Sequence, residues 1–244
     1  MIRMKIAFVL RLINDFSGNC IKEKGFTFVI NDRVVHPVVK EEGLYVFLEP
    51  MENNTRVVIE SPFYHSCSVT IDKKTLDPQE PVAEVRLYEK AGKQISRTAG
   101  ILTGILDKCK NYPTEVYAKK SSSLGLTVRE YRYIEGEHWI LFSGFTKETI
   151  LGKTWLLDDS ENPTVVILQE KRGINEYRAE IICGEPEKIR SGTPIFRAYR
   201  SVTDRFGAYA IPVEGGEETK ILEVAALHEN KKLNKEGDLM WQSL

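Results

Sequence analysis

The sequence has few cysteines, and none of them has the spacing of a metal or redox site. The four cysteines lie far apart, at Cys20, Cys67, Cys109 and Cys183. Zinc sites usually contain a close pair such as C-x2-C, and thiol redox sites use C-x-x-C. The sequence therefore indicates neither kind of site, and we expect free thiols, no metal ion and no cofactor.

The chain also lacks an excess of charge of either sign. Its 34 Lys and Arg residues balance 35 Asp and Glu residues, for a net charge of -1. A nucleic-acid-binding protein normally shows a basic excess, so we expect no nucleic acid partner.

No apolar run approaches the roughly 20 residues that a membrane-spanning helix needs. The apolar start of the chain is interrupted by Arg11 and Asp15 too early for a signal peptide. We expect a first β-strand there, no membrane insertion, and a protein that is cytoplasmic when it is synthesised.

Motifs for catalysis are missing as well. The sequence contains no phosphate-binding glycine loop, no H-E-x-x-H pair, and in Phe142–Phe145 only part of the G-x-S-x-G nucleophile turn. His65 and Cys67 are two residues apart and would share one strand face, which leaves a thiol hydrolase as a minor hypothesis. We predict that the protein is not an enzyme.

Two acidic pairs, Asp158-Asp159 and Glu217-Glu218, are typical of solvated loops. The alternative is a loop Ca²⁺ site, which needs about six converging oxygen ligands.

What the sequence does contain is alternation of apolar and polar residues with a period of two, broken by Pro, Asn, Asp and Gly. This pattern predicts β-strands and an all-β fold of tandem small β-sandwich modules with a short C-terminal tail. The expected strands are 5–13, 26–30, 34–39, 44–48, 56–60, 68–71, 83–88, 100–106, 114–119, 126–134, 139–143, 153–157, 164–168, 177–183, 194–199, 208–213 and 219–226. In the first part of the chain we expect turns at Asn31-Asp32, Glu42-Gly43, Asn53-Asn54 and Ser61-Pro62.

Composition shifts divide the chain into four expected parts. A β-sandwich module covers 1–92 and ends at the polar stretch 89–94. A second β-module covers 93–170, and a third covers 171–230. Modules of this size bury little surface alone, so we expect the second and third to pack together. The tail is 231–244.

One phrase recurs: a carboxylate shortly before a Gly, followed by an alternating aromatic and apolar strand. It is found at 41–48, at 204–213 and, in a looser form, at 135–142. Glycine adopts positive φ at no steric cost, and a carboxylate accepts hydrogen bonds from nearby backbone N–H groups. The phrase therefore predicts a tight turn that leads into a strand.

The Asp-x-x-Gly-x-Tyr-x-Ile sequence at 204–211 and the Gly-x-Tyr-x-Phe sequence at 43–47 resemble bacterial carboxypeptidase-regulatory-like and transthyretin-like β-sandwich modules. The resemblance implies rigid spacers, adaptors or adhesive units, including accessories of phage-tail-like contractile particles that are released after synthesis. Transthyretin-related hydrolases end in a Tyr-Arg-Gly-Ser motif, whereas this chain ends Trp241–Leu244, so the resemblance implies no such activity.

The C-terminal tail holds a cluster of apolar residues, Leu239, Met240, Trp241 and Leu244. A frayed tail is one interpretation. The other is that these residues bind another protein subunit, because an exposed Trp is unfavourable without a partner. The other subunit could also be a second copy of this chain, which would make the protein a homo-oligomer.

Aromatic residues gather in the second module at Tyr131, Tyr133, Trp139 and Trp155. If they form an exposed row they could stack on sugar rings, which makes a carbohydrate-binding protein the alternative function. Core packing is the simpler explanation. The leading hypothesis is a non-catalytic structural or adaptor protein whose partners are other protein subunits of an assembly.

Overall fold

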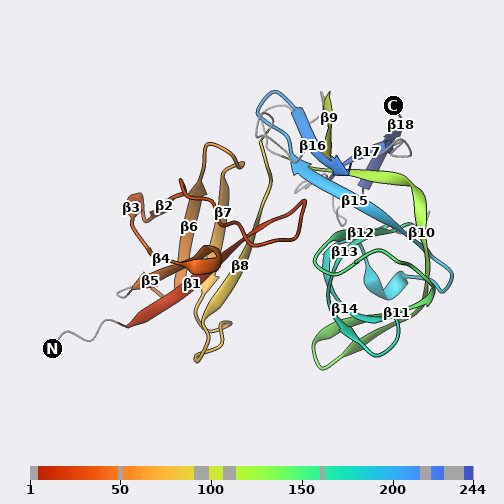
Figure 1. Cartoon of the computed structure of the whole chain (residues 1–244), viewed down its shortest axis with the longest axis horizontal. Helices are drawn as coiled ribbons and strands as arrows, with labels where there is room; N and C mark the ends of the chain where they lie inside the picture. Colours follow the sequence, from red (N-terminus) through yellow and green to blue (C-terminus); the bar gives the residue numbers. More distant parts are fainter. Residues whose placement is uncertain are drawn as a thin grey trace. The chain divides into compact units, whose positions relative to one another are not determined.

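The computed structural model describes residues 5–48, 52–90, 99–106, 114–159, 163–214, 221–227 and 239–243. It confirms the all-β prediction (Figure 1). The chain divides into two compact units, Met1–Lys93 and Gln94–Leu244, called here the N-terminal and the C-terminal unit. In the described part of the chain, no helix has both the length and the apolar character that crossing a membrane requires.

The N-terminal unit is a two-layer sandwich. One sheet has the strand order β4-β5-β1-β8 and the other has the order β3-β2-β6-β7. The strands are β1 Ile6–Asn14, β2 Thr27–Ile30, β3 Arg33–Val35, β4 Val38–Lys40, β5 Leu44–Leu48, β6 Asn54–Glu60, β7 Cys67–Asp72 and β8 Val82–Leu87. All neighbours are antiparallel except β1 and β8, which run parallel.

The core of this sandwich is built from alternate residues of each strand. On β5 the inward side chains are Tyr45 and Phe47, and Phe8 on β1 stacks on Phe47 with 4.7 Å between ring centroids. Phe28 on β2, in the opposite sheet, contacts the same two β5 rings. The period of two seen in the sequence thus places the large aromatic side chains between the sheets.

Two predicted turns of this unit are confirmed. Asn31 and Asp32 have φ of 50° and 59° and join β2 to β3, as expected for a two-residue hairpin. Gly43 has φ of 74° at the end of the short 3-10 helix η1, Glu41–Gly43, which leads into β5. Residues 34–39, predicted as one strand, form the ends of β3 and β4, because His36 and Pro37 interrupt the pairing.

The C-terminal unit contains a sheet that closes on itself. Its strand order is β11-β14-β13-β12-β15-β10-β17-β18, and β10 also pairs with β11, so that β10, β11, β14, β13, β12 and β15 form a closed ring. The strands are β9 Ala99–Ile105, β10 Glu115–Ile134, β11 Glu137–Gly144, β12 Thr154–Leu157, β13 Thr164–Arg172, β14 Glu176–Cys183, β15 Pro194–Val202, β16 Ala208–Glu214, β17 Ile221–Leu227 and β18 Leu239–Ser243. Figure 1 shows this ring; the 3-10 helix η3, Pro186–Lys188, which connects β14 to β15, has no buried residue.

The long strand β10 makes the closure. Its first half pairs with β15 and β17, and its second half pairs with β11. The register with β15 shifts between Lys119 and Ser123 and again before Thr127, so the strand bends between its two sets of partners. The sequence predicted separate strands at 114–119 and 126–134; this prediction was wrong, because the polar serines between them continue the strand.

The interior of the ring is filled mainly by aliphatic and aromatic side chains. They include Trp155, Leu157, Val166, Leu168 and Ile195. A second cluster, with Leu156 and Val165, lies on the opposite face of the same strands. Strands β12 and β13 are therefore apolar on both faces, which explains their continuous apolar sequence.

The predicted boundary at 170 falls within β13, and the closed sheet takes strands from both sides of it. Outside the ring, β9 and β16 form a two-stranded sheet, and β17 and β18 extend the large sheet next to β10.

Candidate interaction surface

The sequence-predicted thiol pair lies at the start of β7. The side chain of Cys67 packs against the core of the N-terminal unit, and its backbone pairs with Ile59. His65 precedes the strand and donates its backbone N–H to the carbonyl oxygen of Tyr88. Cys67 therefore contributes to core packing, and its position does not support the hypothesis of a thiol hydrolase.

A second thiol, Cys183, lies near a buried tyrosine in the C-terminal unit. The Tyr117 hydroxyl donates a hydrogen bond of 2.5 Å to Glu115, and Tyr117 is fully buried. Burial raises the pKa of the Cys183 thiol to about 11, so the thiol is protonated at neutral pH. This group is part of the packing of β10 and β14, and the protonated thiol is a weak nucleophile.

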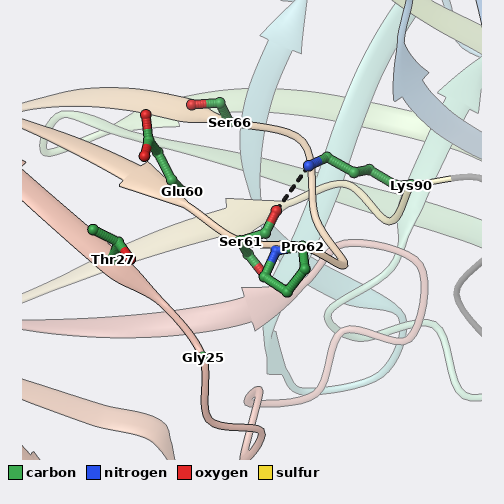
Figure 2. Close-up of a pocket in the computed structure, with 7 residues that line it drawn as sticks. All are labelled: Gly25, Thr27, Glu60, Ser61, Pro62, Ser66 and Lys90. Atoms are coloured by element: carbon green, nitrogen blue, oxygen red, sulfur yellow. Dashed lines mark hydrogen bonds between the residues drawn. The ribbon is translucent and has the colours of Figure 1, made fainter.

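An open hollow of about 430 Å³ lies on the N-terminal unit (Figure 2). Its lining residues are Gly25, Thr27, Glu60, Ser61, Pro62, Ser66 and Lys90. The Lys90 ammonium donates a 2.7 Å hydrogen bond to the backbone oxygen of Ser61, which is the dashed line in Figure 2. The Lys90 ammonium is therefore already bonded to Ser61, another residue that lines the hollow.

The acidic pair at the end of β12 is engaged in ion pairs. Lys119 Nζ lies 2.7 Å from Asp158, and Arg190 Nε lies 3.8 Å from Asp159. In the described part of the chain, no group of three or more His, Cys, Asp or Glu side chains is placed to hold a metal ion. Glu217 and Glu218 lie outside the described residues.

The four aromatic residues do not form an exposed row. Trp139 and Trp155 are buried, Tyr131 is half-buried, and Tyr133 is exposed. Trp155 fills the ring interior and donates its indole N–H to the backbone oxygen of Ile150 at 2.8 Å. The two tryptophans are core residues, so the sugar-stacking surface expected as an alternative is not formed by them.

The C-terminal apolar cluster falls largely on a strand. Residues Leu239 to Ser243 form β18, whose backbone pairs antiparallel with β17 from Leu227 to Glu223. Leu244 lies outside the described residues. The backbone of this segment is thus paired within the chain, and binding of its side chains to another subunit remains a prediction.

A charged group attaches β16 to the closed sheet. Glu214, at the end of β16, lies 3.0 Å from Lys153 Nζ and 3.8 Å from Arg197 Nε. The Arg197 guanidinium is buried, stacks over the rings of Tyr199 and Trp155, and donates to the backbone oxygen of Thr154. These contacts fix the position of the Arg197 side chain, so we assign Arg197 a structural role.

Exposed apolar side chains gather at one end of the closed sheet. Phe145 follows β11, Leu151 precedes β12, and Ile174 lies in the turn between β13 and β14. Phe145 is 74% and Ile174 is 87% exposed. We call these three residues the loop-tip surface.

Hydrogen bonds join the Phe145 and Ile174 loops to each other and the Leu151 loop to strand β13. The Asn175 side-chain amide donates to the backbone oxygen of Gly144 at 3.0 Å. The backbone N–H of Phe142 donates to the oxygen of Asn175 at 2.8 Å, and Gly152 N–H donates to Leu168 at 2.7 Å. These bonds place the Phe145 and Ile174 loops side by side and fix the Leu151 loop on β13, so the tips are presented by an ordered scaffold.

Sequence reasoning missed the loop-tip surface. A signal was present in Gly173-Ile174-Asn175, where Gly and Asn predict a turn and an aliphatic residue stands between them. Turn positions usually carry polar residues, so a bulky aliphatic side chain at the tip indicates a contact outside the turn.

No known protein family matches this sequence, and no curated protein is similar to it.

Proposed function

We propose that this protein is a non-catalytic structural or adaptor protein that contacts other protein subunits in a larger assembly. The observation that carries the proposal is the loop-tip surface, in which hydrogen-bonded loops hold Phe145, Leu151 and Ile174 toward solvent. Full burial of one large apolar side chain stabilises a complex by about 1.5–3 kcal/mol. Burial of all three would therefore contribute several kcal/mol to the free energy of binding.

Two further features support a binding role over catalysis. The thiols Cys67 and Cys183 take part in packing, and the ammonium of Lys90 in the hollow is bonded to a backbone oxygen. The resemblance of 204–211 and 43–47 to adaptor-type β-modules suggests a phage-tail-like contractile particle as the assembly.

A photo-cross-linking residue at position 174 of the full chain, expressed in its native cells, tests the proposal. We expect cross-links to one structural subunit, in a fraction that sediments faster than the free chain. The matched control carries the same residue at Gln169, an exposed polar position on the same hairpin.

The double variant Phe145→Ser with Ile174→Ser is expected to lower the amount of chain in the fast-sedimenting fraction by about tenfold or more, as the loss of two buried anchors predicts. Equal cross-linking from positions 174 and 169, or a chain that is recovered only as a free monomer, would rule the adaptor role out.

A further inference from the structure

The outer face of the sheet β4-β5-β1-β8 is apolar, although the core lies on its other side. On β5 the outward residues are Leu44, Val46 and Leu48, which alternate with the core residues Tyr45 and Phe47. A sandwich sheet that faces only water normally alternates apolar and polar residues. This face therefore has the composition of an interface.

The apolar residues line up across the sheet. Val38 on β4 pairs with Val46 on β5, Val46 pairs with Val9 on β1, and Val9 pairs with Val82 on β8. Every strand of the sheet thus contributes one valine to a single row. In the next row, Leu48 on β5 pairs with Ile6 on β1.

Solvent reaches this face. Val38 is 45% and Ile6 is 49% exposed, whereas Val46, Leu48 and Val82 are half-buried. Only the central Val9 is nearly covered by its neighbours.

A charged row, with three charged residues and Leu44, borders the valines. It runs Lys40, Leu44, Arg11, Glu84 across the same four strands, and Arg11 donates to Glu84 at 3.0 Å within the row. The row therefore has a cation at one edge of the sheet and a carboxylate at the other.

From this arrangement we infer that the face binds the same face of a second copy of this chain. A two-fold axis that is parallel to the strands and passes between β5 and β1 places β5 over β1 of the second copy and β4 over β8 of the second copy. Val46 then lies over Val9 of the second copy, and Val38 over Val82 of the second copy. Leu48 lies over Ile6 of the second copy.

The same operation places Lys40 opposite Glu84 of the second copy, and Glu84 opposite its Lys40. Both ends of this charged row thus gain an ion pair from one symmetry axis, with Leu44 over Arg11 of the second copy between them, while the valine row lies over the valine row of the second copy. Facing sheets rotate by about 30°, which shifts the edges most, and the long Lys and Glu side chains accommodate that shift.

The area of the face indicates how tightly two copies should bind. Four strands spaced about 4.8 Å apart and about five residues along each span roughly 20 Å by 16 Å. This is below the about 800 Å² that each partner contributes to an interface of standard size, so we expect a reversible dimer. The inference concerns the N-terminal unit and does not depend on the loop-tip surface of the C-terminal unit.

Sedimentation of the purified full chain tests the inference over concentrations from about 1 μM to about 1 mM, the range of a weak dimer. We expect the average mass to rise from monomer to dimer. Val46→Lys is expected to raise the dissociation constant by at least about tenfold, because it places an unpaired ammonium at the interface centre. Its side chain points away from the core, so circular dichroism should show an unchanged fold.

The matched control is Val58→Lys, on the outer face of the other sheet. There Val58 pairs with Val29, and Arg56 and Glu60 lie on either side of Val58 along the same face of β6. It should leave the dimer intact. A chain that is monomeric at every concentration, or one whose dimer survives Val46→Lys, overturns the inference.

Charge reversal tests the symmetry axis itself. Lys40→Glu alone and Glu84→Lys alone each place like charges opposite each other, so both should weaken the homodimer several-fold. In an equimolar mixture of the two variants, a heterodimer restores opposite charges at both edges. Tighter association of the mixture than of either variant supports the register, and equal association of all three samples overturns it.

Discussion

At the residue scale, two carboxylate-Gly phrases of the sequence show how a local pattern becomes a turn. The Asp204 carboxylate accepts hydrogen bonds from the backbone N–H groups of Phe206 and Ala208, at 2.8 and 2.9 Å, and Gly207 has φ of 77°. Gly43 also has positive φ, but its surroundings add a second constraint: a Cβ at this position would overlap the backbone oxygen of Ile21. Gly43 is therefore required both for its conformation and for close packing.

Gly43→Ala is predicted to lower the free energy of unfolding by about 3 kcal/mol or more. Positive φ costs a non-glycine residue about 1–2 kcal/mol, and the overlap with Ile21 adds about 1–3 kcal/mol. Urea unfolding of the N-terminal unit measures the effect. Gly25→Ala is the control, because Gly25 also has positive φ but no atom lies within 4 Å of the added Cβ. Equal losses in the two variants would show that the close approach to Ile21 contributes nothing.

At the element scale, the closed sheet depends on strands that serve more than one neighbour. β10 pairs with β15, β17 and β11, and β12 is buried on both faces. Among the described strands, β16 pairs with β9 alone, and it is joined to the closed sheet by contacts that include Glu214 with Lys153 and Arg197. The attachment of β16 is therefore partly electrostatic.

This attachment predicts a pH dependence. Burial tends to raise the pKa of Glu214, but the hydrogen bond from Lys153 and the charge of Arg197 outweigh it and hold the pKa below the ordinary value of 4.5. A carboxyl whose folded pKa is lowered stabilises the fold above its unfolded pKa, and this stability is lost as the pH falls through the folded value. The free energy of unfolding of the C-terminal unit should thus fall as the pH is lowered through and below 4.5, the ordinary pKa of this carboxyl.

Two variants check the origin of that slope. Glu214→Gln removes the titrating group, and Lys153→Met removes the donor that lowers its pKa. Each should make the pH dependence shallower, with a modest effect because the Glu214 side chain is 37% exposed. A slope that is the same in both variants and in the wild type would contradict this assignment.

At the scale of the whole molecule, the chain consists of two units with separate cores. Among the described residues, the buried side chains of the N-terminal core lie between Ala7 and Leu87, and those of the closed-sheet interior lie between Leu126 and Ile195. The proposed contacts are also divided: the loop-tip surface belongs to the C-terminal unit and the valine row to the N-terminal unit. An adaptor with one binding surface on each unit could join two kinds of contact in one chain.

Separate folding of the two units is the corresponding prediction. Residues 1–93 and residues 94–244, expressed as two chains, should each show dispersed amide signals in NMR spectra, because each unit has its own packed core. The spectrum of the full chain should contain most signals of both fragments. A fragment 1–93 that is unfolded at a temperature where the full chain is folded would disprove independent folding.

Much of the local structure followed from the sequence because it depends on local physics. The period of two identified strands such as 44–48, and Asn31-Asp32 and Gly43 identified turns through their tolerance of positive φ. The main failure was β10, which was predicted as two strands at 114–119 and 126–134, whereas long-range pairing with β15 kept the strand continuous.

The candidate surfaces could not be predicted in the same way, because exposure depends on what the rest of the chain covers. Trp139 and Trp155 are as aromatic as any sugar-binding residue, and only the tertiary structure decided that they are buried: Trp155 fills the interior of the closed sheet, and Trp139 lies under the Arg172 guanidinium. The apolar strands β1 and β5 were compatible with a sheet covered on both faces or on one. Alternation, turn chemistry and the all-β class were determined by the sequence itself, because each arises between residues close in the chain. Tertiary structure alone decided which apolar side chains still face solvent, because burial results from pairing between distant strands.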